Sequence, residues 1–173
     1  MLVFVIFNIC TKYDTIFDKC CSILYKDFKT SKYLLTFPNI PIFIIDNLTA
    51  ILVLHLHDKV FNTSEYTEFI NNYINNIEVD KNGIIISMIP TNRKIYRNIR
   101  GSQFAYAIFL LSKINKEVAY KYYVILKEHF IISKHYMVYN LYGVKEYMKD
   151  ISLLPIQCLF ASPTLYHVLL QMP

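Results

Sequence analysis

Apolar residues recur at three- and four-residue steps in two separate segments, and this spacing most restricts how the chain can fold. One stripe runs through residues 12–29, and a clearer one runs through residues 64–77. The second stripe consists of Tyr66, Phe69, Ile70, Tyr73, Ile74 and Ile77. Because a helix turns once in 3.6 residues, each stripe gathers on one face that a core must cover. Ser64 is placed to cap the second helix, with Glu65 and Glu68 in its first turn.

A third helix is predicted directly after Gly101, with Ser102 as its cap. Its buried side would carry Phe104, Ala107, Ile108, Leu111 and Ile114. Residues 118–130 continue a helical pattern less regularly. The second half of the chain is therefore expected to contribute helices to the same core.

Short apolar runs bounded by turn-forming residues predict strands between and after these helices. The predicted strands are residues 40–45, 50–56, 83–89, 93–99 and 136–144, and two more in the uncharged segment 151–173. Residues 80–83, DKNG, form the turn before the third run, and residues 90–92 divide a hairpin whose second arm is basic. The first ten residues, MLVFVIFNIC, are expected to form a strand or a packed extension. The predicted fold is α+β, a single domain over residues 1–173 with helices on one face of a mixed or antiparallel sheet.

Charge is divided unevenly along the chain. Residues 1–80 hold six lysines against nine acidic residues, a balance of −3, whereas residues 81–150 hold twelve basic against four acidic residues, a balance of +8. A difference of this size suggests a polyanionic partner for the middle of the chain, although a solvated basic face would also explain it.

The sequence contains no catalytic or cofactor-binding pattern, so we expect neither an enzyme nor a cofactor. Among three glycines there is no phosphate-binding loop, and the four cysteines have no metal-binding spacing, which predicts reduced thiols. His55 and His57 would share one face of a strand, but no third ligand lies nearby, so structural or surface histidines are expected rather than a metal site.

All three arginines of the chain fall within eight residues that end at Gly101. Arg93, Arg97 and Arg100, joined by Lys94, can bind phosphate oxygens through charged hydrogen bonds. Tyr96 adds a ring on which an exposed base could stack. This pattern predicts contact with RNA.

Three stretches in this order resemble the 5S rRNA-binding "L five" family of large-subunit ribosomal proteins. NIRGSQFAYAIFLL is similar to the place where a strand of that family ends in an aliphatic-Arg-Gly turn and a long helix begins. YNLYGVKEY looks like its Asn-rich strand and following turn, and FPNIPIFIIDN is similar to its first strand, ending here at Asn47. The likeness covers most of residues 13–147. The loop after the second strand is only PTNRK here, which predicts a shorter reach toward tRNA.

The resemblance implies a noncatalytic structural protein of the central protuberance of a large ribosomal subunit. Its partners would be rRNA, including 5S rRNA where one exists, the peptidyl-site tRNA, the small-subunit head and other ribosomal proteins. Asn47, Gly101 and Lys145 join the cationic group as expected RNA-binding residues. Together with a composition typical of an A+T-rich gene and the absence of a presequence, the resemblance implies a mitochondrial ribosome and a mitochondrially encoded chain.

Two other classes of function are compatible with the sequence. One is a viral or organellar protein-interaction module that binds a partner through apolar surface and no nucleic acid. The other is a small organellar membrane subunit anchored by the uncharged segment 151–173, although two prolines and several polar residues interrupt it, and we expect no membrane contact.

Overall fold

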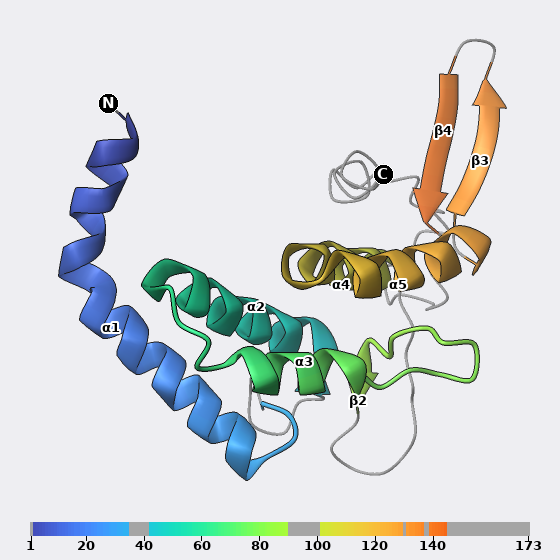
Figure 1. Ribbon diagram of the computed structural model, residues 1–173. Helices are drawn as coiled ribbons and strands as arrows, with labels where there is room; N and C mark the ends of the chain where they lie inside the picture. Colours follow the sequence, from blue (N-terminus) through green and yellow to red (C-terminus); the bar gives the residue numbers. More distant parts are fainter. Residues whose placement is uncertain (1, 35–41, 90–100, 130, 137–138, 145–173) are drawn as a thin grey trace, which may run out of the picture.

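A computed structural model describes residues 2–34, 42–89, 101–129, 131–136 and 139–144, and these are mostly helical (Figure 1). The elements in chain order are α1 (Leu2–Thr30), β1 (Ile42–Phe43), α2 (Ile44–Phe61), α3 (Thr67–Asn75), β2 (Met88–Ile89), α4 (Gly101–Ile114), α5 (Lys116–His129), β3 (Ile131–Tyr136) and β4 (Tyr139–Val144). The cationic arm at 93–99 and the segment 151–173 lie outside the described residues.

Helix α1 confirms the prediction for residues 12–29 and extends it toward the N-terminus. The prediction of a strand or packed extension for the first ten residues is wrong from Leu2 onward, because α1 begins there. Phe17, Leu24 and Phe28 turn toward the core, and Phe28 is buried. The stripe is therefore confirmed as a core face only in part, because Tyr13, Ile16 and Cys20, which also belong to it, are exposed.

Helix α2 replaces both strands predicted between residues 40 and 56. Only Ile42 and Phe43 are extended, and they pair with Ile89 and Met88 as the antiparallel β1–β2 ladder. Helix α2 packs against α1, α3 and α4, so it is covered on several sides. A helix covered in this way needs no polar face, and its apolar run cannot be told from a buried strand by spacing alone.

Helix α3 confirms the predicted helix, but its first turn is held differently from the expectation. The residue before it is Tyr66, and Ser64 makes no side-chain cap. Instead Asp58, from the end of α2, accepts hydrogen bonds from the Tyr66 backbone N–H and the Thr67 hydroxyl, each at 3.0 Å. A carboxylate at a helix start satisfies free N–H groups and favours the helix dipole.

The predicted turn at residues 80–83 is present. The Gly83 N–H donates to the Asp80 carbonyl at 3.0 Å, and Gly83 has φ of +78°, a conformation that glycine adopts without strain. The strand that follows is shorter than predicted, because residues 84–87 form a buried stretch with a single bridge, Val79 to Ile85, before β2.

Helices α4 and α5 form a helical hairpin that packs on α2. The predicted buried stripe of α4 is confirmed for Phe104, Ala107, Ile108 and Leu111. Asn115 separates the two helices, and its side-chain oxygen accepts the N–H groups of Glu117 and Val118 at the start of α5. The chain then forms the antiparallel β3–β4 hairpin, so the strand predicted at 136–144 is confirmed over 139–144, while β3 was not predicted.

The described helices and strands agree with the predicted α+β class, but they are not arranged in the predicted layers. The strands form two separate two-stranded antiparallel sheets, and the core lies mainly between helices α1 to α5. The described part of the chain therefore contains no larger sheet with helices on one face. None of its helices has the length and apolar character needed to cross a bilayer.

Candidate nucleic-acid interface

Two of the eight predicted RNA-binding residues lie in the described part of the chain. These are Asn47 in α2 and Gly101 at the start of α4. The remaining six, Arg93, Lys94, Tyr96, Arg97, Arg100 and Lys145, lie outside the described residues.

Asn47 is fully buried and its side chain is bonded within the protein. Its amide oxygen accepts the Leu34 N–H at 2.8 Å, and its amide nitrogen donates to the carbonyls of Leu34 at 3.2 Å and Phe43 at 3.0 Å. These bonds tie the segment after α1 to the start of α2. Because Asn47 is 0% exposed, its side chain is not accessible to RNA, contrary to the expectation from the sequence.

Gly101 is the buried first residue of α4. The chain therefore enters the core directly after Arg100. Helix α4 packs on α2 and α5.

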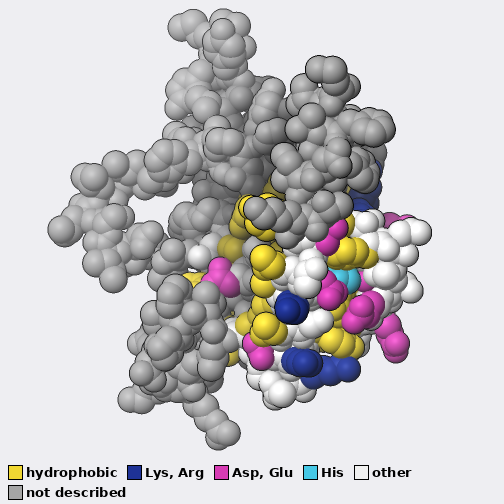
Figure 2. Space-filling model, turned by 90° about the vertical axis from the view of Figure 1, so that its left-hand side faces the viewer, with side chains coloured by type: hydrophobic (Ala, Val, Ile, Leu, Met, Phe, Trp, Pro, Cys, Tyr) yellow, Lys and Arg dark blue, Asp and Glu magenta, His cyan; other side chains and the backbone are white. Residues whose placement is uncertain are grey.

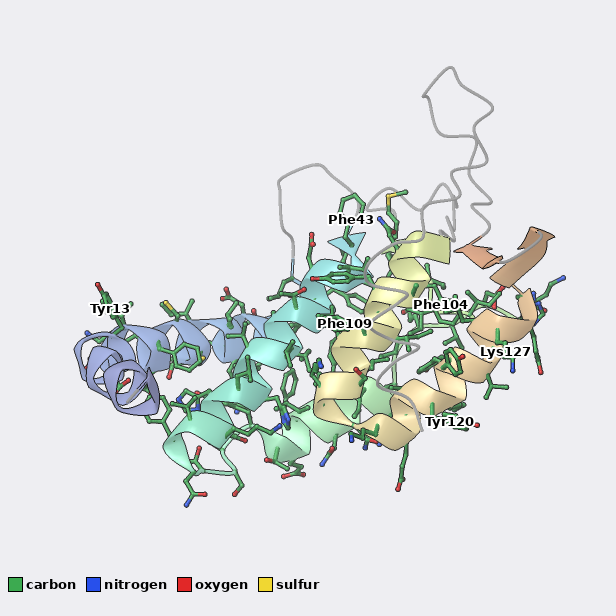
Figure 3. The ribbon with its side chains drawn as sticks, turned by 90° about the horizontal axis from the view of Figure 1, so that it is seen from above. Tyr13, Phe43, Phe104, Phe109, Tyr120 and Lys127 are labelled. Atoms are coloured by element: carbon green, nitrogen blue, oxygen red, sulfur yellow. The ribbon has the colours of Figure 1, made fainter. Side chains whose placement is uncertain are left out.

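Helix α5 carries lysines and tyrosines on one outward face. Lys116, Tyr120, Tyr123 and Lys127 are spaced by four, three and four residues, which places them on one side of a helix. We call this set the Lys–Tyr face. Ala119, Tyr122 and Leu126 are buried on the core side, and Tyr123, at the border of the face, is partly buried against that core. Tyr120 and Lys127 can be followed along α5 in Figure 3.

The Lys–Tyr face has the chemistry that RNA requires. Tyr120 is 49% exposed, and its ring lies 6.3 Å from that of Tyr123 at an interplanar angle of 38°. Lys116 and Lys127 are exposed, and neither forms an ion pair with a carboxylate of the described residues. Lysines supply charge for phosphates, and exposed rings stack on unpaired bases.

A similar set lies on α4. Tyr106 and Phe109 stack with their ring centroids 6.0 Å apart, and the Lys113 ammonium lies 5.0 Å from the Phe109 ring centre. The residues are spaced by three and four, so they also share one side of their helix. The sequence predictions did not identify either set, although the spacing of lysine and tyrosine in residues 116–127 carries the signal.

A polar cluster lies between α1, α2 and α3, and its His57 and Asp58 are buried. His57 Nε2 lies 3.0 Å from Asp18 Oδ1, and His57 Nδ1 lies 3.7 Å from Asp58 Oδ1. Asp58 accepts from Thr63, Thr67 and the Tyr66 N–H. Burial works against the charge of Asp58, but these hydrogen bonds outweigh it and hold the carboxyl pKa below its ordinary value.

This cluster has the geometry of a structural site. Burial, with nearby Cys20 and Asp18, raises the pKa of the Cys21 thiol to about 11, so it is a poor nucleophile. The rings of Phe17, Phe61 and Tyr66 pack around His57. Within the described ranges, no three His, Cys, Asp or Glu side chains come together as metal ligands do.

The histidine pair does not have the predicted arrangement. His55 and His57 lie on α2 rather than on a strand, so their side chains point in different directions. His57 joins the polar cluster, whereas burial and the neighbouring Lys59 lower the pKa of His55. The expectation of structural histidines agrees with the contacts of His57.

An open groove of about 480 Å³ lies between the end of α1 and the start of α2. It is lined by Leu24, Asp27, Thr30, Ser31, Leu34, Asp46 and Ala50. Its wall has no cluster of titratable groups suited to catalysis.

The chain matches no protein-family model, no curated protein sequence and no solved structure.

Proposed function

We propose that this protein is a noncatalytic RNA-binding constituent of a large ribosomal subunit, and specifically of a mitochondrial ribosome. The observation that carries the proposal is the Lys–Tyr face of α5, in the same half of the chain as Arg93, Arg97 and Arg100. Exposed lysines alone are ordinary on a helix. Lysines on either side of the exposed Tyr120 ring are what single-stranded RNA uses.

The order of the described elements supports the ribosomal assignment. A leading helix, the helix α3, a helix that begins at Gly101 and a strand that ends at Val144 follow one another as the resemblance implies. The likeness does not extend to its first strand, because only Ile42 and Phe43 are extended there and helix α2 begins at Ile44. The partners proposed are rRNA near 5S rRNA, the peptidyl-site tRNA, the small-subunit head and neighbouring ribosomal proteins. The Lys–Tyr face would contribute to the rRNA contact.

The mechanism is electrostatic positioning. Each phosphate that a lysine or arginine neutralises releases counterions, so log affinity falls with log salt by about 0.7 to 0.9 per contact. Base stacking on tyrosine adds affinity that depends little on salt. The two kinds of contact are therefore separable in one experiment.

The test is a salt series of binding to large-subunit rRNA fragments. Lys116→Ala with Lys127→Ala should weaken binding and flatten the salt slope by about 1.5. Replacing Arg93, Arg97 and Arg100 by Ala should flatten it further. Lys59→Ala with Lys81→Ala, two exposed lysines elsewhere, is the matched control and should leave the slope unchanged.

An unchanged slope in both the lysine and arginine variants would contradict the proposal. Co-sedimentation supplies an independent result, because a ribosomal protein travels with large subunits through moderate salt. A protein that stays at the top of the gradient would favour the alternative of a protein-interaction module, for which the exposed apolar side of α1 is the supporting observation.

A further inference from the structure

Helix α1 has an apolar side that the rest of the described protein does not cover. Tyr13, Ile16 and Ile23 are 56–58% exposed, and Cys20 between them is exposed as well. We call these four residues the α1 seam. Figure 2 shows hydrophobic side chains in a column on this side of the molecule, and Figure 3 shows Tyr13 directed away from α2.

The spacing of the seam is that of a coiled coil. Its members are separated by three, four and three residues, and the sequence continues the pattern upstream with Ile6 and Ile9. A seven-residue repeat of this kind, kept over residues 6–23, presents a straight apolar edge to a partner helix. The seam ends at Asp27, where the next position of the repeat is charged.

The position of α1 adds to the need for a partner. The N-terminal half of α1 extends past the end of α2 and away from the other helices (Figure 1). Residues 2–10 of this half read LVFVIFNIC. A helix that is apolar on nearly all sides is stable in water only when it is covered.

Charge beside the seam selects the direction of pairing. Lys19 and Lys26 are exposed; Lys19 precedes the seam residue Cys20, and Lys26 precedes Asp27, the charged position of the repeat that follows the seam, so both are g residues of the repeat. In an antiparallel pair, the g lysines of one helix would lie beside the g lysines of the other, and their like charges would repel. A parallel pair places Lys26 of one copy beside Asp27 of the other, because a g residue borders the partner's next a position.

We propose that α1 pairs in parallel with α1 of a second copy of this chain through the α1 seam. The pair has two-fold symmetry, the commonest arrangement of homo-oligomers, and it brings the two Cys20 side chains face to face. Helix α1 carries four lysines against three aspartates, a near balance that gives little attraction to the other apolar occupant, an anionic bilayer. This inference does not rest on the proposed RNA-binding function.

Sedimentation of the full chain under reducing conditions tests the pairing. The protein should be dimeric at about 100 µM, and Ile16→Glu with Ile23→Glu should weaken the dimer at least about 100-fold, since burying each isoleucine contributes a factor of ten or more. Val60→Glu on α2 is the matched control, because Val60 is 57% exposed and outside the seam. Circular dichroism of the variants checks that the helices remain.

Cross-linking at the native Cys20 tests the direction. In a variant with Cys10→Ser and Cys158→Ser, mild oxidation should give a disulfide-linked dimer, because parallel a positions lie within the 4.4–6.8 Å between Cα atoms that a disulfide spans. Adding Cys20→Ser should remove the product. Cys21 is buried and should not replace it.

Several results would overturn the inference. One is a chain that remains monomeric at the highest concentration, and another is a double glutamate variant that still dimerises. The others are a Val60→Glu variant that loses the dimer equally and a dimer that gives no Cys20 cross-link. A monomer that binds vesicles of phosphatidylserine would assign the seam to a membrane. A dimer that forms only after removal of residues 151–173 would assign it to the chain's own C-terminal segment.

Discussion

Helices α1 to α3 and helices α4 to α5 use their polar side chains in opposite ways. In the first region, Asn47, His57 and Asp58 are buried and their side chains contact other groups of the protein. In the second, Lys116, Tyr120 and Lys127 lie at the surface. These polar side chains therefore support folding in the first region and remain accessible to a partner in the second. Exposure separates the structural candidates from the functional ones.

The largest effect is expected from removing Asp58. Asp58→Ala should lower the free energy of unfolding by about 3 kcal/mol, because three donors lose a buried charged acceptor. Urea unfolding followed by circular dichroism measures it. Asp58→Asn keeps an acceptor and should cost less. The folded variant should bind RNA with unchanged affinity. A loss of RNA binding without a loss of stability would contradict the difference between the two regions.

A smaller loss of stability is expected for Asn47. Asn47→Ala should cost about 2 kcal/mol, because the Leu34 N–H and two carbonyls lose their partner. The exposed Asn71→Ala on α3 is the matched control and should stay within about 0.5 kcal/mol of the wild type. If Asn47→Ala weakened RNA binding at full stability, Asn47 would belong to the interface after all.

The corresponding change in the second region should act on binding alone. Tyr120→Ala should reduce RNA affinity about fivefold to tenfold, the usual effect of removing one stacked ring, with no change in the urea midpoint. Tyr120→Phe retains the ring and should bind like the wild type. Fluorescence anisotropy with a labelled single-stranded RNA distinguishes these outcomes. Loss of stability in Tyr120→Ala would instead make Tyr120 a packing residue.

The smallest effect is expected on the free energy of unfolding at alkaline pH. The pKa of Cys21 is raised from 9.0 to about 11 in the folded protein, so folding favours the neutral thiol. This contribution is complete below pH 9 and is lost as the pH rises toward 11. The wild type should therefore lose more stability than Cys21→Ala over this interval. Parallel curves for the two proteins would show that the thiol does not contribute.

The helices could be predicted where one face is polar. Residues 64–77 and the segment after Gly101 show a clear stripe, because each helix has a solvent side on which polar residues are placed. Helix α2 could not be predicted, since its neighbours cover it and its sequence reads equally well as two strands. The same error put His55 and His57 on one face.

The candidate site was only partly predictable. The charge division and the spacing of Lys116, Tyr120, Tyr123 and Lys127 are readable in the sequence. The contact of His57 with Asp18, 39 residues away, is not. Nor could the sequence show that the Asn47 side chain hydrogen-bonds with the backbone of Leu34.

By itself, the sequence determined what depends on local spacing and composition: where amphipathic helices form and that the middle of the chain is basic. The tertiary structure decided which polar groups are free, since burial and hydrogen-bond partners depend on segments far apart in the chain. It made α2 a helix, buried Asn47 and Asp58, and left one side of α1 and one side of α5 facing solvent. Desolvation makes a buried polar group seek a partner within the protein, and only the folded chain shows which groups are buried.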